Sequence, residues 1–137
     1  MFYPVTMTKK GEYTITDLGM TCEAASMEDA CDKFVSTLSD FIETNFRKAG
    51  KPIPMPSELR ADDGVVALNL KLQARILLWN LLKEKYMSTS EFARQFGVSR
   101  QYAQFMVDGN GAVSLERYCD AFDLLGYYPS LVLNRYK

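Results

Sequence analysis

Four polar side chains that are close together in the sequence have the chemistry needed to read DNA. Ser99, Arg100, Gln101 and Gln104 lie in or beside the two short helices predicted from TSEFARQFGVSRQYAQFMV, residues 89–107. An arginine can bond bidentately to guanine and a glutamine to adenine, and the free N–H groups at a helix start can bind a phosphate. These residue types therefore indicate contacts with base edges and the DNA backbone. The candidate DNA contacts are Ser88, Thr89, Ser90, Ser99, Arg100, Gln101, Tyr102, Gln104 and Asn110.

Two short helices joined by a tight turn are expected to position these side chains. Ala93 is the small residue that lets the second helix cross the first closely, and Gly97, four residues later, can take the left-handed conformation of a turn. Ser99 then caps the second helix. The apolar residues expected between the helices are Phe92, Phe96, Val98, Ala103 and Met106. This pattern is typical of a DNA-binding helix-turn-helix, although any small helical domain can place a glycine between two amphipathic helices.

Further helices are predicted on both sides of this pair. ARILLWNLLKEKY has helical periodicity. Its inward-facing residues are predicted to be Ile76, Leu77, Leu81 and Leu82, with Trp79 alongside. Ser88 precedes Glu91 by three residues, which is a capping box opening the helix EFARQF. Ser114 is the predicted cap of the last helix, LERYCDAFDLL, which Gly126 closes.

The front half of the chain is predicted to begin with a β-hairpin. YPVTMT and EYTITDLG alternate apolar and polar residues with a period of two, and Gly11 supplies the turn between them. Val5 and Met7 are expected on one face of the first strand. Tyr13 and Ile15 carry the alternation through the second strand.

A helix and a third strand are expected to follow the hairpin. Ser26 stands three residues before Asp29 and predicts the start of a helix over roughly residues 27–47. Its apolar stripe, predicted to pack on the hairpin, is Met27, Ala30, Cys31, Phe34, Leu38, Phe41 and Ile42. Gly50 and prolines 52, 54 and 56 break this helix. VVALNLKL then predicts a strand with Val66, Leu68, Leu70 and Leu72 on one face.

Composition sets the broad class of the protein. The 137 residues are 47% hydrophobic and 24% charged, as in a globular protein. No run approaches the ~18 apolar residues of a membrane span, and MFYPVTMTKK lacks the pattern of a secretory signal. A cytoplasmic protein is therefore expected. Cys22, Cys31 and Cys119 form no CxxC pair, and the chain has no histidine, so neither a zinc site nor a cofactor is expected.

The absence of histidine also excludes Ser-His-Asp, Cys-His and histidine-metal catalysis. Carboxylate chemistry with two metal ions needs about three to four clustered acids. Asp17 is the one acid well inside the predicted strands, and Asp32 and Asp40 face away from much of the apolar stripe of their helix. We therefore assign no catalytic or metal-binding residue and do not expect an enzyme.

Charge is divided unevenly along the chain. Residues 1–73 carry 8 Lys+Arg and 11 Asp+Glu, a net charge of −3, whereas residues 74–137 carry 8 and 6, a net charge of +2. These values sum to the −1 of the whole chain. The acidic front and mildly basic back suggest two units with different partners.

The order of these parts resembles a known family. FARQFGVSRQYAQFMVDGNGAVSLERYCDAFDLLGY resembles the Xre/Cro-type helix-turn-helix family over roughly residues 74–127. YPVTMTKKGEYTITDLG, SMEDACDKF and above all GKPIPMPSEL resemble HicB antitoxins, which join a partial RNase H-like fold to a DNA-binding domain. The resemblance implies an α+β fold. Residues 1–72 would form a small antiparallel sheet with one packed helix, which binds a toxin, and residues 73–137 an all-α domain for DNA binding and dimerisation.

The resemblance also implies two partners. HicB antitoxins neutralise a HicA toxin, a small basic mRNA-cleaving ribonuclease, and repress their own operon by binding operator DNA. An acidic front half is complementary to a basic partner and favours fast association with it. The candidate toxin contacts are Glu12, Asp17 and Glu23, each of which is otherwise ordinary solvated surface.

Two alternatives stay open from the residues alone. The chain could be a stand-alone phage- or plasmid-type repressor whose front half serves dimerisation or ligand sensing. A single reading helix contacts few base pairs, so we expect a homodimer or higher even-numbered oligomer on half-sites about one helical turn apart. YYPSLVLNRYK is expected to form a strand, with Leu131 and Leu133 on one side, that pairs with its copy or packs on its own domain.

Overall fold

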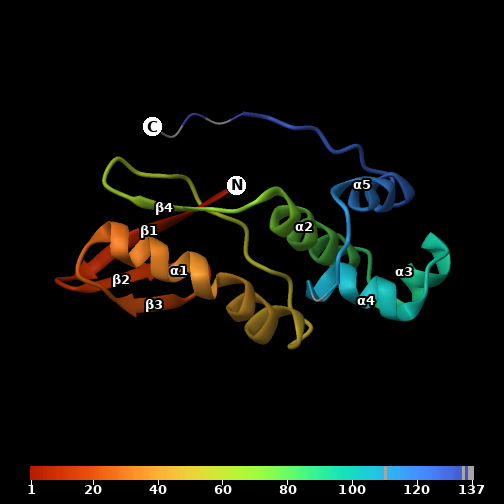
Figure 1. The fold of residues 1–137 in the computed structure, drawn as a ribbon, viewed down its shortest axis with the longest axis horizontal. Coiled ribbons are helices and arrows are strands. Elements are labelled where there is room, and N and C mark those ends of the chain that lie inside the picture. The colour runs from red at the N-terminus through yellow and green to blue at the C-terminus, as the bar shows by residue number, and fades with distance from the viewer. Residues whose placement is uncertain (110, 134, 136–137) are drawn as a thin grey trace.

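The computed structural model describes residues 1–137 except 110, 134, 136 and 137. Among the described residues, a four-stranded antiparallel sheet and helix α1 (Met27–Ile42) form one end of the molecule. Helices α2 (Leu70–Glu84), α3 (Thr89–Phe96), α4 (Arg100–Asp108) and α5 (Leu115–Leu124) form the other end (Figure 1). This layout confirms the expected α+β fold class.

The sheet has the spatial order β3-β2-β1-β4. Its strands are β1 (Phe2–Lys9), β2 (Glu12–Ile15), β3 (Met20–Glu23) and β4 (Gly64–Ala67). The predicted hairpin of β1 and β2 is confirmed, and Gly11 between them has a φ of +80°, where a residue with a Cβ would be strained. The buried side chains of Tyr3, Val5 and Ile15 belong to the hydrophobic core that α1 shares with the sheet.

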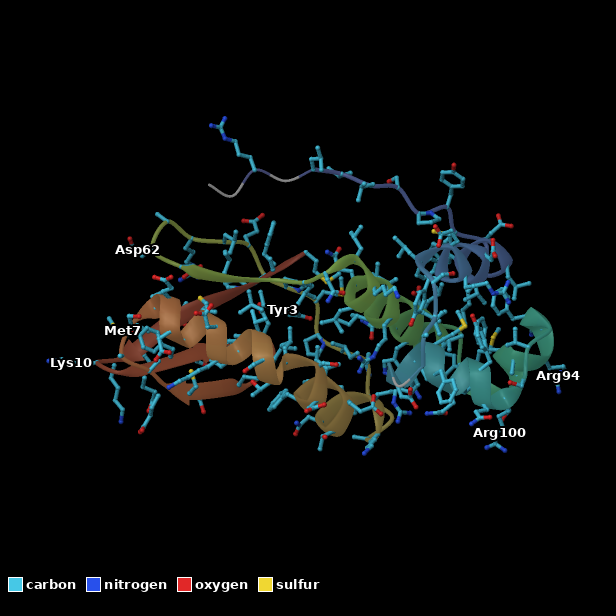
Figure 2. All side chains as sticks on the ribbon, viewed as in Figure 1. Tyr3, Met7, Lys10, Asp62, Arg94 and Arg100 are labelled. Atoms are coloured by element: carbon cyan, nitrogen blue, oxygen red, sulfur yellow. The ribbon has the colours of Figure 1, made fainter. Side chains whose placement is uncertain are left out.

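Val5 and Met7 were predicted on one face of a half-buried strand; Val5 is fully buried, but Met7 is 59% exposed. Strand β4 pairs with β1 only from Phe2 to Val5, and the ladder with β2 is irregular between Met7 and Lys9. Met7 therefore lies beyond the end of β4, on the part of the hairpin that projects from the body of the molecule (Figure 2).

Two further strand assignments differ from expectation. Strand β3 was not predicted. The predicted third strand, VVALNLKL, is shorter than expected, because β4 ends at Ala67 and helix α2 begins at Leu70. The side chain of Asn69 accepts a hydrogen bond from the N–H of Leu72 at 2.8 Å, which caps the helix. Leu70 and Leu72 therefore lie in a helix and not on one face of a strand.

Helix α1 begins and packs as predicted. The Ser26 hydroxyl accepts from the N–H of Asp29, and the Asp29 carboxylate accepts from the N–H of Ala25, both at 3.1 Å. The buried residues of α1 are Ala30, Phe34, Leu38 and Ile42. The helix continues as a π-helical turn, η1 (Glu43–Arg47), so the predicted end near residue 47 is confirmed with a change of winding.

Each helix of the second half begins after a polar capping residue. The side chains of Asn69, Ser88, Ser99 and Ser114 each accept the N–H of the residue three positions later. The inward orientation predicted for α2 is confirmed for Ile76, Leu81 and Leu82, and Trp79 is also buried. It is wrong for Leu77, which is 41% exposed because it lines a surface cavity.

The two halves share one hydrophobic core. The boundary expected after residue 72 falls in the first turn of α2, and a single cluster of buried side chains extends from the sheet to α5. The proline-rich segment, residues 50–57, connects both sides. The Asn80 side chain accepts from the N–H of Ile53 at 2.7 Å and donates to its carbonyl at 2.8 Å. The hydroxyl of Tyr3 donates to the Pro54 carbonyl at 2.5 Å.

The C-terminal segment, residues 127–133, has no strand, contrary to prediction. It runs back from α5 toward the end of the molecule that holds the sheet (Figure 1), and Leu131, Val132 and Leu133 are 72%, 69% and 91% exposed. These three side chains are therefore largely exposed, and residues 127–133 do not form the strand packed on its own domain that was one of the two alternatives. Tyr127, at the root of the segment, borders the cavity that Leu77 also lines.

Candidate DNA-binding surface and acidic edge

Helices α3 and α4 pack through the apolar residues expected between them. Phe92, Ala93, Ala103 and Met106 are buried, and Phe96 and Val98 are partly buried against the same core. Gly97 ends α3 with a φ of +74°, the left-handed conformation predicted for the turn. The structure thus contains two helices joined by a tight turn at the predicted positions. We call this unit the α3–α4 pair.

Five of the nine predicted DNA contacts lie at the start of α4, and three of these five are exposed to solvent. Ser99, Arg100 and Gln101 are exposed, while Tyr102 and Gln104 are half-buried. The Ser99 hydroxyl accepts from the N–H of Tyr102 at 3.0 Å, so it caps the helix. The surface at the start of α4 is therefore polar and carries the positive charge of Arg100.

The other candidate DNA contacts lie at the start of α3 or outside the described residues. Ser88 caps α3 by accepting from the N–H of Glu91 at 3.1 Å. Ser90 is exposed and Thr89 is half-buried. Asn110 lies outside the described residues. Sequence reasoning did not select Arg94, which is exposed on α3; Figure 2 shows it pointing to solvent at the same end of the molecule as Arg100.

The other end of α4 is held by two buried side chains that the sequence analysis did not select. The Tyr118 hydroxyl donates to the Met106 carbonyl at 2.7 Å, and Arg75 Nε donates to the Val107 carbonyl at 3.1 Å. Burial raises the pKa of Tyr118 to about 12, so the hydroxyl remains a neutral donor at physiological pH. The one signal in the sequence for Arg75 is a charged residue inside an otherwise apolar run, ARILL.

Arg117 joins α5 to the α3–α4 pair. Its guanidinium lies 4.5 Å from the ring centroid of Phe96 and 5.8 Å from that of Tyr102. Such cation–π contacts contribute about 0.5–1 kcal/mol each at exposed sites. Phe96 also stacks on Phe92, with ring centroids 5.3 Å apart. The outer edge of the pair is thus fixed by aromatic contacts as well as by its inner core.

Two of the three predicted toxin contacts are neighbours in the structure. Glu12 on β2 lies directly opposite Glu23 on β3 in the antiparallel ladder. Like charges directly opposite each other destabilise a pair of strands. Lys9 Nζ lies 3.6 Å from the Glu12 carboxylate and offsets part of this charge. We call the Glu12–Glu23 pair the acidic edge; a cationic partner placed there would relieve its repulsion.

Asp17 does not belong to the acidic edge. It follows the opposite end of β2, and its carboxylate accepts two hydrogen bonds from Ser57, from the N–H at 2.9 Å and from the hydroxyl at 3.0 Å. Asp17 therefore anchors the end of the proline-rich segment to the sheet. It also borders a surface cleft formed with residues 57–60 and Asp63.

The described part of the chain contains neither a cluster of metal-binding side chains nor a membrane-spanning helix. Within those residues, no group of three or more His, Cys, Asp or Glu side chains is placed to hold a metal ion. None of the helices described there is long and apolar enough to cross a membrane.

The fold and the surface together define an α+β protein in which a sheet-and-helix unit is packed against a helical unit with a polar, exposed helix start. The chain is similar in sequence to known proteins over nearly its whole length. The chain is 26% identical over 142 residues to Antitoxin HicB of Escherichia coli strain K12, covering 97% of this chain and 99% of that protein. Antitoxin HicB of Escherichia coli O157:H7 is similar to the same extent. No family model matches the chain.

Proposed function

We propose that the chain is the antitoxin of a HicAB-like toxin–antitoxin system. It neutralises a HicA-like mRNA-cleaving toxin through the sheet and α1, and it represses its own operon by binding operator DNA through the α3–α4 pair. The observation that carries the proposal is the similarity to proteins named Antitoxin HicB over 97% of the chain. The chain acts by binding, without catalysis or a cofactor, in the cytoplasm.

The α3–α4 pair supports the DNA-binding part of the proposal. The capped start of α4 combines the N–H groups of its first turn with the exposed side chains of Arg100 and Gln101. The N–H groups suit a phosphate, and the two side chains suit base edges. Arg94 on α3 adds a second cation at this end of the molecule. Binding through these groups is expected to weaken steeply with salt, because each neutralised phosphate releases condensed counterions.

Dimerisation follows from the DNA-binding part of the proposal. One α4 helix reads few base pairs, so two copies on half-sites about one helical turn apart are needed for useful specificity. The exposed apolar residues Leu131, Val132 and Leu133 support a contact between two copies through the C-terminal segment. Burial of this segment against a second copy would remove apolar surface from water.

The acidic edge supports the toxin-binding part. Glu12 and Glu23 are adjacent on β2 and β3, within a front half whose net charge is −3. A basic ribonuclease is complementary to such a surface. The hairpin of β1 and β2 lies at the opposite end of the molecule from the α3–α4 pair, as the positions of Lys10 and Arg100 show in Figure 2. Toxin and DNA can therefore be bound by separate surfaces.

Co-expression is the first test. The chain is produced with the small open reading frame adjacent to its gene and purified by a tag on the chain. Copurification of a small basic protein that stops growth when it is expressed alone would support the antitoxin function. If nothing copurifies while the chain still shifts its own promoter DNA, the chain is a stand-alone repressor and the toxin-binding half of the proposal fails.

Matched variants then separate the two surfaces. Arg100→Ala or Gln101→Ala should cost about 1–3 kcal/mol of operator binding and leave toxin neutralisation intact. Glu12→Lys with Glu23→Lys should weaken toxin capture and leave operator binding by the free antitoxin unchanged. Equal loss of both activities in either set would contradict the use of two separate surfaces.

A further inference from the structure

Arg75 is a charged side chain buried where four structural elements meet. It lies on α2, and its side chain is 7% exposed. Its Nε donates to the Val107 carbonyl of α4 at 3.1 Å, and its Nη1 donates to the Ser39 hydroxyl of α1 at 2.9 Å. Its Nη2 lies 3.5 Å from the Glu43 carboxylate of η1. One guanidinium therefore contacts the sheet-and-helix unit and the predicted reading helix at the same time.

The contact with Val107 meets a specific need of α4. The last carbonyls of an α-helix have no partner within the helix and must be satisfied by other groups. In α4 the Phe105 carbonyl accepts from the N–H of Gly109, and the Met106 carbonyl accepts from the Tyr118 hydroxyl. The Val107 carbonyl accepts from Arg75. A cation at a helix C-terminus also interacts favourably with the helix dipole.

On its other side the Arg75 guanidinium faces the Glu43 carboxylate, which a second arginine holds in place. Glu43 is held by Arg47, whose Nε lies 2.6 and 2.7 Å from the two carboxylate oxygens. The Glu43 and Arg75 side chains are 15% and 7% exposed, so solvent screens their interaction weakly. Arginine alone among the side chains offers a rigid planar fork of donors that can reach three acceptors in different directions.

The turn that follows α4 lies directly against the Arg75 guanidinium. Gly109 has a φ of +79°, and a Cβ added to it would lie 2.5 Å from Arg75 Nη1 and 3.0 Å from the guanidinium carbon. Glycine is therefore required at this position by the backbone conformation and also by the approach of Arg75. The guanidinium has no room to move toward α4 without displacing this turn.

We propose that Arg75 is a positioning residue that sets the orientation of α4 relative to α1 and so fixes where the start of α4 meets DNA. The proposal rests on the DNA-binding function proposed above. Arg75 itself lies at the far end of α4 from Ser99 and Arg100 and contacts no base. Its loss leaves the reading side chains in place on α4 and frees the angle between that helix and the rest of the chain.

Arg75→Met and Arg75→Lys test this role, with Tyr118→Phe as the matched control. Methionine keeps apolar volume without the fork, and lysine keeps the charge but cannot reach three acceptors. Tyr118→Phe removes the neighbouring cap of α4 and no contact with α1. Fluorescence anisotropy compares the affinity for the operator fragment with the affinity for a scrambled duplex. In both Arg75 variants, we expect the ratio of operator affinity to scrambled-duplex affinity to fall about tenfold, which is equivalent to the loss of one charge-assisted hydrogen bond. In Tyr118→Phe this ratio should fall less.

A second measurement does not depend on DNA. Residual dipolar couplings of the amides in α1 and α4 report the angle between the two helices in the free protein. We expect this angle to change or to become averaged in the Arg75 variants and to be kept in Tyr118→Phe. Variants that keep both the wild-type angle and the operator preference would overturn the positioning role. If the wild type binds no DNA while the angle still depends on Arg75, the DNA-binding function fails and the structural role of Arg75 stands.

Discussion

The capping serine of α4 allows the proposed DNA binding and the folding stability to be tested separately with one substitution. The Ser99 hydroxyl accepts from the N–H of Tyr102 at 3.0 Å, and an aspartate caps a helix about as well as a serine. Its charge also interacts favourably with the positive end of the helix dipole, by about 0.3–1 kcal/mol. Ser99→Asp is therefore expected to leave the free energy of unfolding unchanged or slightly raised.

The same substitution should weaken DNA binding strongly. It places a negative charge where the proposed function puts a phosphate. With ~6 Å between the two charges, Coulomb repulsion is about 0.7 kcal/mol in bulk water and about 2.8 kcal/mol at an effective dielectric constant of ~20. Operator affinity should then fall by between about threefold and about a hundredfold. The loss should be largest at low salt, because counterions screen the repulsion.

Ser114→Asp provides the control. Ser114 caps α5 by accepting from the N–H of Arg117 at 3.2 Å, so an aspartate there adds the same charge at the start of a different helix. Urea unfolding should be alike for both variants, whereas anisotropy titrations with operator DNA should differ. Wild-type DNA affinity in a folded Ser99→Asp variant would refute the placement of the α4 start against a phosphate. An equal loss in both variants would point to overall charge as the cause.

Three further predictions concern the fold. Gly64→Ala should cost about 1–3 kcal/mol in urea unfolding, because the added Cβ would lie 2.5 and 2.9 Å from the sulfur atoms of two α1 side chains. Asn80→Ala removes both hydrogen bonds to the Ile53 backbone and should cost about 2–3 kcal/mol, measured by thermal unfolding; a loss below ~0.5 kcal/mol would show that the segment is held by other contacts. Burial raises the pKa of Tyr118 to about 12 in the folded chain, above its unfolded value of about 10. Its contribution to stability should be complete below about pH 10 and lost as pH rises through about 12. Circular dichroism from neutral to alkaline pH should show a shallower loss for Tyr118→Phe, and an unchanged slope would contradict this reasoning.

The helical half could be predicted well because its signals are local. A capping serine fixes a helix start through one hydrogen bond to a residue three positions away, and Gly97 marks a turn that few other residues accept. The apolar face of α3 and α4 follows from a period of 3.6 residues. Local rules also placed Ser26 at the start of α1 and Gly11 in the hairpin.

The errors arose where several structures satisfy the same local pattern. Leu68, Leu70 and Leu72 alternate like a strand, yet Asn69 between them caps a helix, and the capping signal was the informative one. Strand β3 has four residues and is recognisable as a strand through its pairing with β2, which a sequence alone does not display. Met7 fits the alternation of β1 but lies beyond the end of β4, so its exposure depends on the length of a strand distant in sequence.

The candidate sites also include residues that local signals identify and residues that depend on distant parts of the chain. The residues at the start of α4 were selected by type and position, and they lie together on its exposed end. Arg75 was not selected, because a charged side chain is ordinarily solvated and its burial depends on acceptors from α1, η1 and α4 together. The roles in binding DNA and toxin stay predictions, as do the RNase H-like character of the front half and the oligomeric state.

The proline-rich segment has a consequence for how such a protein can change during evolution. Asn80 of α2 holds the backbone of Ile53, Trp79 donates to the Lys51 carbonyl at 2.8 Å, and the same segment is bonded to the sheet through Pro54. Exchange of one half for that of a related protein would separate these pairs. A gene fusion at this point would yield a folded chimaera when α2 and the proline-rich segment are inherited together, whichever partner the new half binds.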